Sequence, residues 1–145
     1  MIQKSLIPMA LVALLVSAVI GSRGDGTITK SPLIVANRVF AQQTGSISQI
    51  LFTPRQTASY RVSVYQNQAP NNYGPIIQLV WTDELGQEQT PSDVSFCSTI
   101  SSNSNAYVCD GQLYVRAIAG NPIQLNTYVN PAAPPYNIYV TVEEL

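Results

Sequence analysis

The clearest pattern in the chain is the segment ASYRVSVYQ at residues 58–66. Tyr60, Val62 and Val64 fall on one side of an extended chain, and the residues that alternate with them fall on the other side. Alternation with a period of two is typical of a β-strand that has one face in a core and one in solvent. The segment therefore predicts a half-buried strand.

Short segments of the same kind recur along the chain, separated by glycine, proline and asparagine. No segment after residue 32 has the 3.6-residue apolar stripe of an amphipathic helix. The sequence predicts an all-β, antiparallel, jelly-roll-like sandwich of about eight strands after an N-terminal signal helix, with Trp81 as its core anchor. The expected strand segments are Leu33–Phe40, Ser46–Phe52, Ala58–Gln66, Pro75–Asp83, Glu88–Thr90, Asp93–Thr99, Gln112–Ala119, Ile123–Val129 and Tyr136–Glu143.

The N-terminal residues have the pattern of a secretory signal. Lys4 is the only charge before Arg23, and the apolar run Leu6–Ile20 lies between them. Signal peptides have such a positive start and an apolar stretch of roughly 7–15 residues, whereas a membrane span needs about 20 apolar residues. We expect cleavage after Gly21, with Ala18 as the second choice; the alternative is an anchor that is kept.

The signal divides the chain into three regions. Residues 1–21 are the expected signal peptide, 22–32 a flexible linker and 33–145 one sandwich domain. The linker contains Arg23-Gly24-Asp25, a cell-attachment tripeptide that is short enough to occur by chance. Export predicts a secreted protein, extracellular or periplasmic, with no membrane contact after cleavage.

Cys97 and Cys109 are the only cysteines. An even number of cysteines in an exported chain predicts a disulfide bond, here closing the loop Ser98–Val108. Without histidine, two thiols alone do not make a zinc site, and a catalytic thiol has no imidazole base. Asp110-Gly111 predicts a tight turn directly after the second cysteine.

Composition excludes several classes of function. The formal net charge is −1, so there is no basic surface for nucleic acid. The chain has no histidine for a catalytic triad or a metal site, and no glycine-rich phosphate loop. We therefore expect no enzyme activity and no cofactor.

Half of the acidic residues lie around one expected hairpin. Three roles are possible for them: a calcium site, a pair of glycosidase carboxylates, or a solvated tip that discourages aggregation. The spacing of a calcium-binding loop is missing, so the solvated tip is the expectation and calcium the weaker candidate. The residues are Asp83, Glu84, Glu88 and Asp93.

Tyrosine is the most distinctive residue type, with eight copies. Strand parity places several tyrosines and two arginines on the polar side of their strands, where tyrosine offers a large contact area and a hydroxyl group. This face predicts a glycan-binding surface, a subunit interface or ordinary cross-strand pairing. The residues are Tyr65, Tyr114, Tyr128 and Tyr139, with Arg61 and Arg116.

Three segments also carry a resemblance. They are LFTP at 51–54 leading into YRVSVY at 60–65, VWTDE at 80–84 followed by Gly86, and YNIYVTVEEL at 136–145. Together they resemble the small β-modules of uncharacterised bacterial and phage surface proteins, over about residues 39–145. The resemblance implies a jelly-roll-like module that self-associates. It implies no catalytic residues.

These observations predict a secreted, non-catalytic binding or assembly module. Its expected partners are further copies of itself or another surface protein. The alternative is a carbohydrate-binding module that uses the outward tyrosines.

Overall fold

The computed structural model describes residues 31–69, 74–90, 99–102 and 107–145, with backbone only at 99–102. The predicted signal peptide and most of the predicted linker lie outside these residues. Nine strands form the described part, and no helix there is long and apolar enough to cross a membrane. The strands are β1 (Leu33–Gln43), β2 (Ser48–Phe52), β3 (Ala58–Gln68), β4 (Ile76–Asp83), β5 (Gly86–Gln89), β6 (Thr99–Ser102), β7 (Tyr107–Ala117), β8 (Ile123–Tyr128) and β9 (Tyr136–Glu144).

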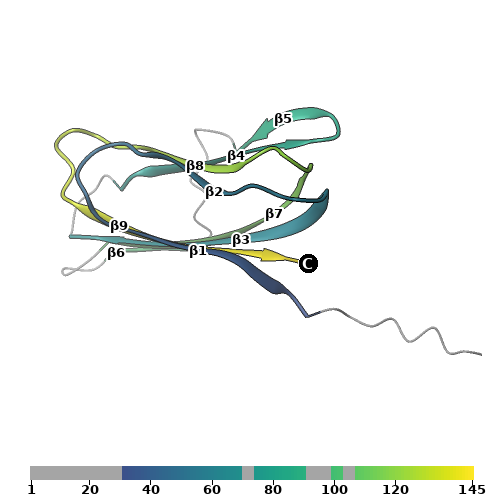
Figure 1. Ribbon diagram of the computed structural model, residues 1–145. Coiled ribbons are helices and arrows are strands. Elements are labelled where there is room, and N and C mark those ends of the chain that lie inside the picture. Colours follow the sequence, from purple (N-terminus) through teal and green to yellow (C-terminus); the bar gives the residue numbers. More distant parts are fainter. Residues whose placement is uncertain (1–30, 70–73, 91–98, 103–106) are drawn as a thin grey trace, which may run out of the picture.

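The strands form two antiparallel sheets that face each other as a sandwich (Figure 1). The five-stranded sheet has the order β1-β9-β3-β7-β6, and the four-stranded sheet has the order β2-β8-β4-β5. The pairs β1–β9, β2–β8, β3–β7 and β4–β5 are those of one long hairpin that is rolled up into two layers. This arrangement is a jelly roll, with β6 added at one edge.

The core lies between the sheets and follows the predicted alternation. Tyr60, Val62 and Val64 of β3 are buried, as are Ile138 and Val140 of the neighbouring β9. The largest fully buried side chains are those of Tyr60 and Tyr136 rather than Trp81. The prediction of Trp81 as the core anchor is wrong, because it is only partly buried.

The position of Trp81 explains its exposure. The pairing of β4 with β8 ends at Val80, and the pairing with β5 continues from Val80 to Asp83. Trp81 therefore lies opposite Glu88 on the β4–β5 hairpin, beyond the last residue of β4 that pairs with β8. Figure 1 shows this hairpin at one end of the sandwich. A period-two pattern gives the face of a strand but not the point at which its neighbour ends.

Two further predictions need correction in the region of β6 and β7. Asp110-Gly111 is not a turn, because β7 continues through it, with Asp110 opposite Tyr65 and Gly111 opposite Val64. Eleven paired positions along β3 outweigh the local turn preference of two residues. The expected loop 98–108 contains β6, and most of the expected strand Asp93–Thr99 lies outside the described residues.

Candidate functional site

The four predicted tyrosines do not share one surface. Tyr65, Tyr114 and Tyr139 lie on strands of the five-stranded sheet, whereas Tyr128 lies on β8 of the four-stranded sheet. Tyr128 is half exposed and its hydroxyl donates to Gln78 Oε1 at 3.2 Å. The prediction of a common face is therefore wrong for Tyr128, because strand parity does not reveal to which sheet a strand belongs.

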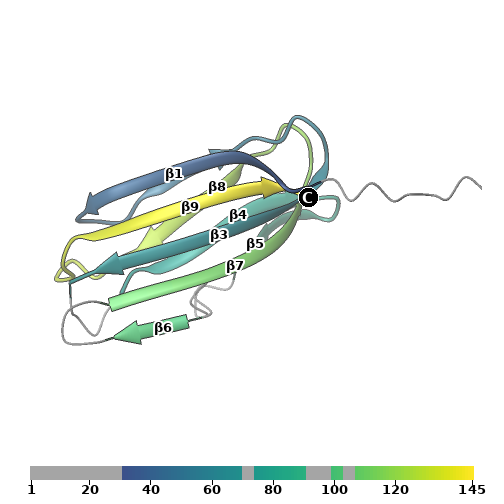
Figure 2. The same ribbon diagram turned by 90° about the horizontal axis from the view of Figure 1, so that it is seen from below.

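Tyr65 and Tyr139 form a pair at the centre of the five-stranded sheet. They are directly opposite each other on β3 and β9, the two strands in the middle of Figure 2. Their ring centroids are 5.9 Å apart at an interplanar angle of 52°, a favourable tilted arrangement. The exposed fractions are 42% and 41%, so both rings contact each other and solvent. Val39 of β1 continues the same row beside Tyr139.

Tyr114 belongs to a second row of the same sheet, in which Arg61 lies between Tyr114 and Glu143. Arg61 Nε donates to Glu143 Oε2 at 2.5 Å. This hydrogen bond lowers the pKa of Glu143, and the bonds to Glu143 and then to Tyr114 raise the pKa of Arg61. Arg61 is therefore engaged with both neighbours of its row, by an ion pair to Glu143 and by a bond to Tyr114.

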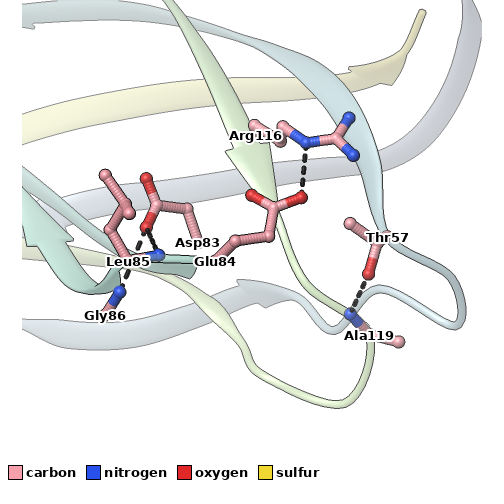
Figure 3. Close-up of polar contacts among 7 residues, drawn as sticks. All are labelled: Thr57, Asp83, Glu84, Leu85, Gly86, Arg116 and Ala119. Carbon is pink, nitrogen blue, oxygen red and sulfur yellow. Dashed lines mark hydrogen bonds and ion pairs between the residues drawn. The ribbon is translucent and has the colours of Figure 1, made fainter.

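Arg116 is also engaged, but at the end of the sandwich. Its Nε donates to Glu84 Oε1 at 2.6 Å, which joins β7 to the turn of the β4–β5 hairpin (Figure 3). The hydrogen bond lowers the pKa of Glu84. The Ile118 N–H also donates to the carbonyl of Thr82 at 2.9 Å. Arg116 thus links the two sheets and is not a neighbour of the Tyr65–Tyr139 pair.

The acidic residues of the same hairpin have separate roles. Asp83 Oδ1 accepts the N–H groups of Leu85 at 2.7 Å and Gly86 at 3.2 Å, which closes the turn (Figure 3). No group of three or more acidic or cysteine side chains that could hold a metal occurs among the described residues. Asp83, Glu84 and Glu88 are therefore not gathered into such a group; Asp93, the fourth residue of the calcium candidate, lies outside the described residues.

Two open hollows adjoin Tyr65 on the outer face of the five-stranded sheet. The first has a volume of about 230 Å³ and is lined by polar groups such as Ser63, Asp110 and Gln112. The second has a volume of about 410 Å³. Its lining residues are Gln42, Tyr65, Asn67, Gln68, Ala69, Val108, Pro135 and Asn137. None of the described residues that line this second hollow, which we call the amide hollow, is charged.

The backbone of Gln42 and the amide side chains of Asn137 and Asn67 are joined in a row in the amide hollow. The backbone N–H of Gln42 donates to Asn137 Oδ1 at 2.8 Å, and Asn137 Nδ2 donates to Asn67 Oδ1 at 2.8 Å. Gln42 has φ of 52°, the only positive value of a non-glycine residue in the described chain, within a bulge of β1. Sequence analysis missed this row, although parity places Asn67 and Asn137 on the face of Tyr65 and Tyr139. The bulge that brings Gln42 to them has no local signal.

Cys109 is buried on β7, with 1% of its surface exposed. Its side chain lies on the inward face of the strand, opposite Gln66 of β3. Cys97 lies outside the described residues. The bond between the two cysteines therefore stays a prediction, and the burial of Cys109 favours a structural over a reactive role for this cysteine.

Comparisons with protein-family models, curated proteins and solved structures found no match for this chain.

Proposed function

We propose that this protein is a secreted, non-catalytic binding module and that it binds carbohydrate at the Tyr65–Tyr139 pair. The observation that carries the proposal is the contrast between these two tyrosines and Tyr60, Tyr128 and Tyr136. The hydroxyls of Tyr60, Tyr128 and Tyr136 have hydrogen-bond partners within the protein. In the described part of the chain, the hydroxyls of Tyr65 and Tyr139 have none. Two half-exposed rings and two unused hydroxyls are thus available to a ligand.

The surroundings of the pair fit the chemistry of a sugar. A pyranose ring has C–H groups on its faces that pack on an aromatic ring, and hydroxyls around its edge that need hydrogen-bond partners. Tyr65 and Tyr139 supply the rings, while the amides of Asn67 and Asn137 lie in the adjoining hollow. Aromatic anchors with a few placed polar groups are the usual composition of a small-ligand site.

The proposal predicts that aromatic truncation removes binding. The protein, screened on a glycan array, should bind glycans, and Tyr65→Ala should weaken the affinity by at least tenfold in a titration. A tenfold loss of affinity corresponds to about 1.4 kcal/mol of binding free energy. This is below the loss of about 2 kcal/mol or more on truncation to alanine that defines a hot-spot residue. Tyr139→Ala should have an effect of similar size.

Tyr128→Ala is the matched control, since Tyr128 is a half-exposed tyrosine of the other sheet. It should leave the affinity unchanged. An empty array with correctly folded protein, or equal loss of affinity in the Tyr65 and Tyr128 variants, would contradict the proposal.

Self-association is a second candidate function, and a different surface favours it. β1 is an edge strand of the five-stranded sheet, so one side of its backbone is not paired with another strand of the sheet. Leu33, Ile34 and Val39 of this strand are more than half exposed. A long edge strand with exposed apolar side chains is a template for pairing with a second chain.

Sedimentation velocity at tens of micromolar tests this candidate. A homo-oligomer is the expected result, and Ile34→Lys should shift the distribution to monomer because a charge on an edge strand opposes pairing. A clean monomer for the unchanged protein, or an oligomer that is insensitive to the lysine, would contradict association through β1.

A further inference from the structure

The direction of the amide row is fixed by one backbone group. The Gln42 N–H can only donate, so the atom of Asn137 that it contacts at 2.8 Å is the side-chain oxygen. The other end of the Asn137 amide is then the nitrogen, which donates to Asn67 at 2.8 Å. It follows that the contacted atom of Asn67 is also the oxygen, and that the Asn67 nitrogen points away from the row.

Both ends of the row therefore have a defined polarity. In the described part of the chain, Asn67 Nδ2 has no partner and is a hydrogen-bond donor. Gln42 Nε2 contacts Asn137 Oδ1 at 3.4 Å, which leaves Gln42 Oε1 as an acceptor without a partner there. Asn137 uses both its oxygen and its nitrogen within the row. The amide hollow thus has one free donor, one free acceptor and the side chain of Tyr65 in its lining.

The bulge in β1 places the Gln42 N–H against Asn137 Oδ1 before a ligand binds. Gln42 has φ of 52°, a conformation that non-glycine residues adopt only when the surrounding structure compensates for it. The hydrogen bond from the Gln42 N–H to Asn137 is one such compensation. Side chains that are already fixed lose little entropy on binding, which favours affinity.

We infer that the amide hollow selects uncharged sugars with adjacent hydroxyls, and that the Asn67 donor sets this specificity. One hydroxyl accepts from Asn67 Nδ2, and a neighbouring hydroxyl donates to Gln42 Oε1. A carboxylate has no proton for Gln42 Oε1, and the described residues that line the amide hollow include no cationic side chain to neutralise it. The acidic Asp110 lies opposite Tyr65 on β7 and lines the other hollow. Uronic and sialic acids are therefore disfavoured. This inference rests on the proposed carbohydrate function.

Asn67→Asp tests the inference with almost no change in shape. One oxygen of the aspartate still accepts from Asn137 Nδ2, so the row remains intact. The second oxygen replaces the donor with a negatively charged acceptor. We expect the affinity for the best neutral glycan of the array to fall at least tenfold, with an unchanged melting temperature.

Asn126→Asp is the matched control. Asn126 lies on the four-stranded sheet and its Oδ1 accepts from Gln124 Nε2 at 2.9 Å, so the substitution makes the same chemical change away from the amide hollow. Its glycan affinity should equal that of the unchanged protein. Equal affinity of the Asn67→Asp variant would overturn the inference while leaving the carbohydrate function in place. If the unchanged protein binds no glycan, the proposed function is contradicted, and the inference that rests on it is contradicted as well.

A second measurement needs no ligand. In NMR spectra, the side-chain NH₂ protons of Asn137 should exchange with solvent more slowly than those of Asn67, because only the former are held in the row. The opposite order of exchange would show that the row has the reverse polarity, and would overturn the assignment of Asn67 as the donor.

Discussion

Replacing Tyr136 with alanine is expected to lower the free energy of unfolding by about 3–5 kcal/mol, the range for truncating a large buried aromatic side chain. Tyr136 is fully buried at the start of β9. Its hydroxyl also belongs to a chain of hydrogen bonds. The Ile47 N–H donates to Thr127 Oγ1, Thr127 Oγ1 donates to the Tyr136 hydroxyl, and this hydroxyl donates to the carbonyl of Gly45. The alanine variant loses both the packing of the ring and this connection between the two sheets. Urea unfolding followed by circular dichroism measures the effect.

Tyr136→Phe separates the two contributions. The ring stays in the core, but the Gly45 carbonyl and the Thr127 hydroxyl lose their partner, at an expected cost of about 1–3 kcal/mol. The order of stability should be unchanged protein, phenylalanine variant, alanine variant. An alanine variant within about 1 kcal/mol of the unchanged protein is too small a loss for a fully buried aromatic residue and would contradict the placement of Tyr136 in the core.

Removing the predicted disulfide bond is the second change with a large expected effect. Cys97 and Cys109 would close a loop whose cross-link is worth about 2–4 kcal/mol in the chain-entropy account. The side chain of Cys109 points inward from β7, the strand that pairs with both β3 and β6. A bond from Cys109 to Cys97 would therefore tie residue 97 to the five-stranded sheet. The double variant Cys97→Ala and Cys109→Ala should therefore unfold at lower urea concentration, measured under oxidising conditions.

The unchanged protein in reducing buffer is the control for this variant. Its stability should fall to that of the double variant, and the double variant itself should not respond to reductant. A thiol assay that titrates two free cysteines in the unfolded, unreduced protein would contradict the predicted bond.

The strands could be predicted from sequence wherever one face is apolar and the other polar. β3 and β9 have this alternation, and both predicted segments lie within one or two residues of the observed bounds. The prediction of a turn at Asp110-Gly111 is wrong because its turn preference is local, whereas its pairing partners on β3 are more than 40 residues away in sequence. A single sequence does not contain this long-range pairing.

The candidate site was predictable only in part, for the same reason. Tyr65 and Tyr139 were placed correctly on the outer side of their strands, but parity gave no means to separate them from Tyr128. Arg61 and Arg116 look equivalent in sequence, yet Arg61 lies within the sheet and Arg116 bonds to the hairpin of the opposite sheet. These differences depend on strand order, which local patterns do not specify.

NMR mapping of the bound glycan tests the central proposal most directly. Backbone and side-chain resonances of the isotope-labelled protein are followed while the best neutral glycan from the array is added. The account predicts that the largest shifts cluster on the outward positions of β3 and β9, at Tyr65, Tyr139, Asn67 and Asn137. Shifts that centre instead on Tyr128 and the outer face of β8, or an absence of any shift at saturating glycan, would contradict it.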